Sequence, residues 1–95
     1  MKLATIICEA VLEERIVEVL HECGAHGHTA FDVRGSGRQG QRSADLVESG
    51  NVQIQVIVKP AVAEALLARL HREFFQDYAM VAYQSEVQVL RPEKF

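Results

Sequence analysis

The chain has 95 residues, of which 48% are hydrophobic and 24% charged, and its formal net charge is -3 at pH 7. These values are typical of one globular domain, and we expect residues 1–95 to form it; the negative charge argues against a protein that coats nucleic acid. No apolar run is long enough for direct membrane insertion, and Lys2 leads into a predicted strand without the apolar stretch of a signal peptide, so a cytoplasmic protein is expected.

The first half of the chain predicts a strand, a helix and a second strand. Residues 3–8 are a short apolar run of the kind that forms a buried strand. Apolar residues then recur at helical spacing, namely Leu12, Ile16, Val19, Leu20 and Cys23. Gly24 is placed to end this helix, and residues 29–34 alternate as a strand does.

The second half predicts the same elements in the order strand, helix, strand. Residues 51–59 alternate most clearly, and Pro60 stands where a helix begins without needing an N–H group. Apolar residues at helical spacing continue to Phe74, and residues 80–90 predict a long last strand. The order β-α-β-β-α-β predicts an α+β, ferredoxin-like fold, in which two helices cover one face of a four-stranded antiparallel sheet.

The face of the sheet that the helices leave open has an unusual predicted composition. It is expected to carry Gln53, Gln55, Ile57, Gln84, Glu86 and Gln88, together with Ala4, Ile6 or their neighbours. Amides beside apolar side chains suit a partly dry contact, which favours a subunit interface. A polar face in contact with water is equally compatible with these residue types.

The connection between the second and third strands, residues 35–50, reads G-S-G-R-Q-G-Q-R-S-A-D-L-V-E-S-G. So long an unpatterned connection is uncommon in a compact domain and is usually functional or disordered. Glycine lets backbone N–H groups point at an anion, and arginine supplies a fixed cationic fork. The candidate anion-binding residues are Gly35, Ser36, Gly37, Arg38, Arg42 and Ser43. The simpler interpretation is a solubilising loop in which the serines form turns.

Residues 24–43, G-A-H-G-H-T-A-F-D-V-R-G-S-G-R-Q-G-Q-R-S, resemble the divergent PII-like signalling proteins linked to bicarbonate transport and carboxysomes. Those proteins share a G-A-x-G-[YH]-T segment and a G-x-G-x-x-x-x-R-S loop start. They also share F-x-D-Y near the end of the second helix, here residues 75–78. In this family the long loop is the flexible T-loop, which corresponds here to about residues 36–50.

The resemblance implies a homotrimer without enzymatic activity that binds an adenine nucleotide in each cleft between subunits. The T-loop would signal to a partner protein such as a bicarbonate transporter or a carboxysome component, and bicarbonate would be a second ligand. Carried over by position, the residues along the phosphates would be Gly35, Ser36, Gly37 and Arg38, with Arg42 and Ser43 as a second loop contact. Gly27, His28 and Thr29 would lie near the base or the ribose.

The sequence departs from typical PII proteins in the loop and after the last predicted strand, and the second difference bears on the ligand. The loop has no tyrosine to accept the modification known in the family. After the last predicted strand, only Arg91 and Lys94 remain as basic residues for outer phosphates. The resemblance therefore favours ADP or AMP, with cyclic AMP and ATP as alternatives, and no obligatory cofactor.

Two other functions compete with this interpretation. A trimeric metal-ion binding or tolerance protein of the same fold is the main alternative, because the chain has four histidines, His21, His26, His28 and His71. They lack the Cys–His spacing of structural zinc sites, so no metal site is assigned. A small phosphate-ester hydrolase is the third alternative, but residues 8–10 read Cys-Glu-Ala where that class needs an arginine-bearing loop. No catalytic residue is assigned.

Overall fold

The computed structural model describes residues 1–37, 40–41 and 50–95. The strands are β1 (Lys2–Glu9), β2 (Thr29–Val33), β3 (Ser36–Gly37), β4 (Gly40–Gln41), β5 (Asn51–Val58) and β6 (Val81–Glu86). The helices are α1 (Glu13–Glu22) and α2 (Pro60–Glu73), with short 3-10 turns η1 (Ala10–Leu12) and η2 (Pro92–Lys94).

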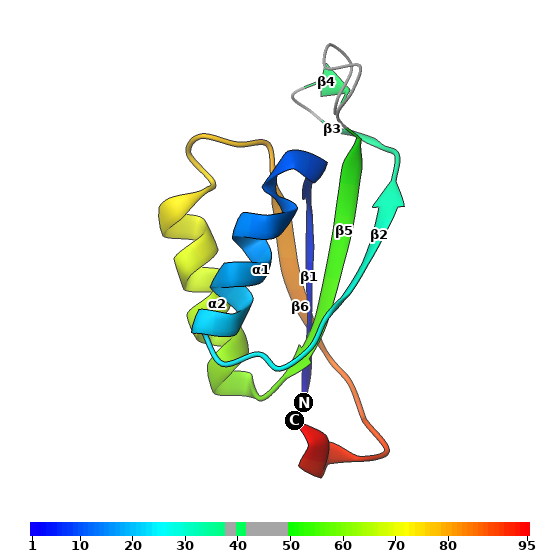
Figure 1. The fold of residues 1–95 in the computed structure, drawn as a ribbon, viewed down its shortest axis with the longest axis vertical. Coiled ribbons are helices and arrows are strands. Elements are labelled where there is room, and N and C mark those ends of the chain that lie inside the picture. Colours follow the sequence, from blue (N-terminus) through cyan, green and yellow to red (C-terminus); the bar gives the residue numbers. More distant parts are fainter. Residues whose placement is uncertain (38–39, 42–49) are drawn as a thin grey trace.

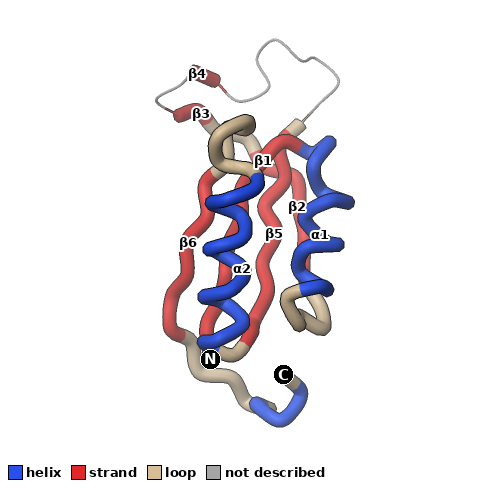
Figure 2. The backbone as a smooth tube through the Cα atoms, turned by 90° about the vertical axis from the view of Figure 1, so that its left-hand side faces the viewer, coloured by secondary structure: helices blue, strands red, loops and turns tan. Residues whose placement is uncertain are grey.

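The sheet has the strand order β2-β5-β1-β6, and every neighbouring pair is antiparallel. Both α1 and α2 lie against the same face of this sheet (Figures 1 and 2). This arrangement confirms the predicted ferredoxin-like fold. It also leaves β2 and β6 as edge strands and the second face of the sheet uncovered by helices.

Local sequence signals set the ends of both helices. Gly24, at φ +104°, ends α1. Its N–H donates to the carbonyl of His21 at 3.1 Å, and the N–H of Ala25 donates to that of Leu20 at 2.9 Å, which together form a Schellman cap. Pro60 is the first residue of α2 and follows an extended N-cap residue, so its missing N–H leaves no bond unmade.

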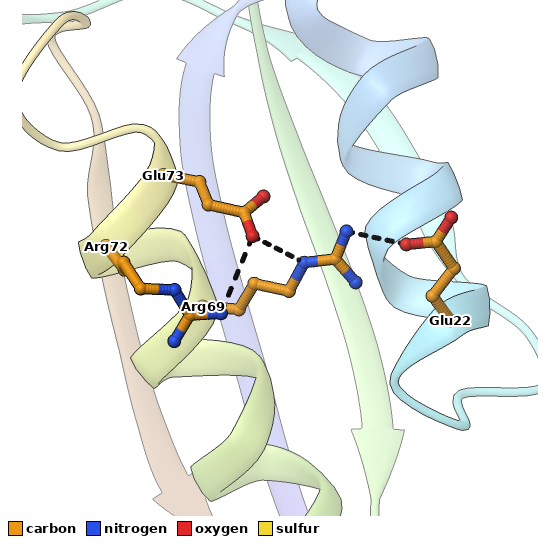
Figure 3. A network of polar contacts seen from close by, with 4 residues as sticks. All are labelled: Glu22, Arg69, Arg72 and Glu73. Atoms are coloured by element: carbon orange, nitrogen blue, oxygen red, sulfur yellow. Dashed lines mark hydrogen bonds and ion pairs between the residues drawn. The ribbon is translucent and has the colours of Figure 1, made fainter.

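The core lies between the helices and the covered face of the sheet. Its largest fully buried apolar side chains are Ile6, Ile16, Leu20, Val52, Ile54, Leu66, Leu70 and Phe74, with Cys8 among them. A surface network joins the two helices (Figure 3): the guanidinium of Arg69 on α2 contacts Glu22 of α1 at 2.6 Å and Glu73 at 3.0 Å. The core therefore holds both helices on the sheet, and the ion pairs add an exposed link between them.

Two expectations about the last strand are wrong. β6 ends at Glu86 rather than at residue 90. Glu86 pairs with Lys2, the first residue of β1, so the partner strand ends there, and one further hydrogen bond follows, from the N–H of Val87 to the carbonyl of Met1. The register also places Gln84 opposite Ala4. Since side chains alternate along a strand, Gln84 and Glu86 lie on the helix side with Ala4 and Ile6, and Gln88 lies outside the sheet.

The open face is consequently more apolar than expected. The predicted Gln53, Gln55 and Ile57 do lie there, beside Leu3, Thr5 and Ile7 of β1. Three large side chains on it are exposed: Phe31 by 43%, Val81 by 40% and Tyr83 by 49%. Half-buried amides thus lie among uncovered aromatic and aliphatic groups.

The connection between β2 and β5, the expected T-loop, begins with a short ribbon that the sequence did not predict. Ser36 pairs with Gln41 and Gly37 with Gly40, which makes β3 and β4 a two-stranded sheet. Residues 38–39 and 42–49 lie outside the described residues, and with them the predicted ligands Arg38, Arg42 and Ser43 and most of the loop that was expected to be flexible. In the described part of the chain, the helices are too short and too polar to cross a membrane.

Candidate functional site

The two feet of the T-loop are anchored side by side at one end of the sheet. Val33 at the end of β2 pairs with Asn51 at the start of β5, which pairs in turn with Glu9 at the end of β1. The N–H of Ala10 donates to the carbonyl of Gly50 at 2.8 Å and so ties the returning foot to η1. The β3–β4 ribbon lies at this end, as does the connection from α2 to β6 (Figure 1).

The first foot of the loop presents an exposed run of the predicted phosphate-binding residues. Arg34, Gly35 and Ser36 are all exposed directly after β2, and Gly37 continues into β3. Among the described residues, Asp32, Val33 and Arg34 line a shallow hollow of about 520 Å³ beside this foot. Since β2 is an edge strand, this part of the site is open on one side in the single chain.

The other predicted contacts lie at the far end of β2. Thr29 begins the strand opposite Gln55 and belongs to the open face. Thr29 lies six positions before Gly35 in the chain, and at the usual rise of an extended chain the two residues are roughly 20 Å apart. His28 instead lines a groove along α1 with Glu18 and His21. The described contacts therefore form two groups at the ends of one edge strand, and His28 belongs to the helix side of the molecule.

Two of the predicted ligand-binding glycines are not required by the fold. Among the described residues, a Cβ built on Gly27 or on Gly35 meets no heavy atom within 4 Å, and neither glycine has a left-handed φ. Gly24 is the contrasting case, because its positive φ disfavours any side chain. A close approach by a group outside the chain would give Gly27 and Gly35 a reason to lack a side chain.

The structure also singles out Asn51, to which the sequence gave no binding role. Its side chain is only 2% exposed, and Oδ1 has no hydrogen-bond partner within the described ranges. Its position gave one signal that could have been used: a polar residue stands where an apolar alternation meets the T-loop. Sequence patterns cannot reveal whether such an amide is satisfied, because that depends on neighbours from other strands.

The connection between α2 and β6, which lies at the same end of the sheet as the β3–β4 ribbon, is held by a cation–aromatic contact. Nη1 of Arg15 on α1 donates to the hydroxyl of Tyr78 at 3.1 Å, and its guanidinium lies 4.8 Å from the centre of the Phe74 ring. The N–H of Tyr78 donates to the carbonyl of Phe74 at 3.0 Å. These contacts fix the turn that carries the predicted F-x-D-Y motif.

The four histidines are exposed and distributed over the described structure. In the part of the chain that is described, no group of three or more His, Cys, Asp or Glu side chains is arranged to hold a metal ion.

The family of the chain follows from a match along almost its whole length. The family described as Nitrogen regulatory protein P-II matches residues 1–94. The chain belongs to the PII family. The resemblance noted in residues 24–43 is thereby confirmed and extends well beyond the T-loop.

Solved structures of PII-like proteins share this fold. A Thermus thermophilus protein assigned as a PII-like signaling protein is 42% identical, with a TM-score of 0.85 over 99% of this chain and 93% of that one. CPII from Thiomonas intermedia, bound to ADP and bicarbonate, is 27% identical, with a TM-score of 0.87 over 99% and 92% of the two chains. A second CPII structure, bound to ADP, AMP and bicarbonate, has 26% identity and a TM-score of 0.89 over the same shares.

Proposed function

We propose that this PII-family protein is a trimeric, non-enzymatic cytoplasmic regulator that binds ADP or AMP in clefts between subunits. The observation that carries the proposal is the similarity, over 99% of the chain, to CPII structures that hold ADP, AMP and bicarbonate. Bicarbonate is accordingly the proposed second ligand. The T-loop would report ligand binding to a partner in inorganic carbon metabolism, such as a bicarbonate transporter or a carboxysome component.

The two groups of proposed contacts at the ends of β2 lie roughly 20 Å apart, which is longer than one ADP molecule, so a single site would take them from two neighbouring chains. The base or ribose would lie near Gly27 and Thr29 of one chain, and the phosphates would lie along Gly35 and Ser36 of the other. A second chain placed against the edge would close the open side of the cleft. The remaining proposed phosphate contacts are Gly37, Arg38, Arg42 and Ser43, and His28 is kept as a contact that requires a movement of its side chain.

The open face of the sheet supports the assembly. Phe31, Val81 and Tyr83 leave a substantial apolar surface in water, which a subunit contact would bury. The half-buried amides of Gln53 and Gln55 can pair with the same groups of another copy. A single 95-residue chain would also gain stability from burying this face, because small domains bury a smaller fraction of their surface than large ones do.

Calorimetric titration of the purified protein with ADP, AMP, cyclic AMP and ATP tests the proposal directly. We expect ADP or AMP to bind at one site per chain, and bicarbonate to bind more tightly once the nucleotide is present. Light scattering should give three times the monomer mass. A protein that ignores all four nucleotides, or one that is a monomer at micromolar concentration, would refute the proposed function.

A further inference from the structure

Asn51 combines burial, an unused hydrogen-bond acceptor and a position at the returning foot of the T-loop. Its backbone lies between Val33 and Glu9, and it follows Gly50, whose carbonyl is held by Ala10. Its side chain is 2% exposed, and within the described residues no donor reaches Oδ1. Alternation along β5 directs the side chain to the open side of the sheet, opposite the core.

A buried amide whose oxygen accepts no hydrogen bond destabilises the fold that contains it. Leaving a buried acceptor without a donor costs about 1–3 kcal/mol, and native proteins contain few such groups. An apolar residue of similar volume would avoid this cost at the same position. Residues that break a local rule in this way are concentrated at functional sites.

The missing partner must be a hydrogen-bond donor, which narrows the chemistry of the ligand. Oδ1 of an amide can only accept, whereas the neighbouring Nδ2 can only donate. A fully ionised phosphate has no proton to offer Oδ1. A hydroxyl next to an oxygen acceptor matches the amide on both atoms, and bicarbonate and the ribose of a nucleotide both present such a pair.

We propose that Asn51 is a ligand-binding residue whose Oδ1 accepts a hydrogen bond from a hydroxyl of the ligand, an inference that rests on the proposed function. The hydroxyl would approach from the exposed residues 34–36, which follow Val33, the β2 residue opposite Asn51.

Asn51→Leu is the main test, because it removes both polar atoms and keeps the number and branching of the side chain's heavy atoms. We expect the variant to lose about tenfold in affinity for the ligand that supplies the hydroxyl, as measured by calorimetry on the intact assembly. Its melting temperature without ligand should equal or exceed that of the wild type. Gln84→Leu is the matched control, since it makes the same chemical change at an exposed amide on the helix side of the sheet.

Two titrations separate the two sources of the hydroxyl. If bicarbonate supplies it, the tenfold loss appears for bicarbonate at saturating ADP, and affinity for ADP is retained. If the ribose supplies it, ADP weakens, and either 2′-deoxy-ADP or 3′-deoxy-ADP binds the wild type and the variant equally. Both results support the inference.

Three results overturn the inference without affecting the proposed function. Unchanged affinity of Asn51→Leu for ADP and for bicarbonate would exclude contact between this amide and a ligand. A variant that no longer forms the assembly, and for that reason binds neither ligand, would assign the amide to a subunit contact instead. A clear fall in melting temperature would mean that Oδ1 is satisfied within the fold. Failure of the wild type to bind any nucleotide would instead remove the proposed function itself.

Discussion

Gly35→Ala should increase stability while weakening nucleotide binding. A Cβ built on Gly35 meets no heavy atom of the described residues within 4 Å, and the backbone is outside the left-handed region, so alanine should fit without strain. Alanine reduces the freedom of the unfolded chain and should stabilise the fold by about 0.4–1 kcal/mol. For a domain of this size that corresponds to a rise of roughly 2–8 °C in melting temperature.

The same methyl group should interfere with the ligand. If phosphate oxygens approach the backbone at Gly35, a Cβ on that surface holds them back, and the loss of a charge-assisted hydrogen bond of about 1.5–3 kcal/mol weakens ADP at least tenfold. Calorimetry with ADP and thermal unfolding at one fixed protomer concentration measure the two effects separately.

Gly24→Ala is the control with the opposite expected sign. Gly24 has a φ of +104° at the end of α1, so alanine there should lower the melting temperature and leave the ADP affinity of the folded protein unchanged. Wild-type ADP affinity in Gly35→Ala would refute the assignment of this backbone to the phosphates. A lower melting temperature of Gly35→Ala would refute the expectation that a methyl group fits at this position without strain.

Three further substitutions test the fold and the assembly. Arg15→Ala removes the hydrogen bond to Tyr78 and an aromatic contact, and urea unfolding should report a loss of about 1–2 kcal/mol. The pKa of Glu86 is lowered from the ordinary carboxyl value of 4.5, mainly by its hydrogen bond from Lys2. The ion pair therefore stabilises the fold above pH 4.5, and this stabilisation is lost as the pH falls through the lowered pKa. In urea unfolding, the free energy of unfolding of Glu86→Gln should therefore be lower than that of the wild type near pH 7, and the two values should converge in acid. Tyr83→Glu places a charge on the open face, and light scattering should then detect monomers.

Each of these substitutions has an outcome that would contradict its reasoning. Arg15→Lys keeps the charge but loses the planar guanidinium, so full retention of stability in that variant would exclude planar stacking on the ring as the cause. If the difference in free energy of unfolding between Glu86→Gln and the wild type grew as the pH falls, the pH dependence would have the opposite sign to the one expected. Leu90→Glu is the control for the assembly, because Leu90 is fully exposed beyond the sheet. Trimers that persist in Tyr83→Glu would exclude the open face as the subunit contact.

The amino-acid sequence by itself determined the order of the main elements, the C-terminal end of α1 and the N-terminal end of α2. Alternation in residues 51–59 and helical spacing up to Phe74 are local patterns, and Gly24 and Pro60 act on the backbone where they stand. The long connection of residues 35–50 could also be recognised from sequence, since it lacks the apolar periodicity of its neighbours, and its role as a T-loop is what the family resemblance implies. The roles of individual loop residues came from the family resemblance, because spacing alone does not distinguish phosphate ligands from solubilising charges.

Only the tertiary structure decided which face each β6 side chain occupies and where that strand ends. Both depend on the register against β1, and a shift of one residue would exchange the faces of Tyr83 and Gln84. The separation of Thr29 from Gly35 along one edge strand, and the buried unpaired amide of Asn51, likewise depend on pairings between distant segments. Such pairings are fixed by the packing of whole elements, whereas periodicity and capping are fixed within a few residues along the chain.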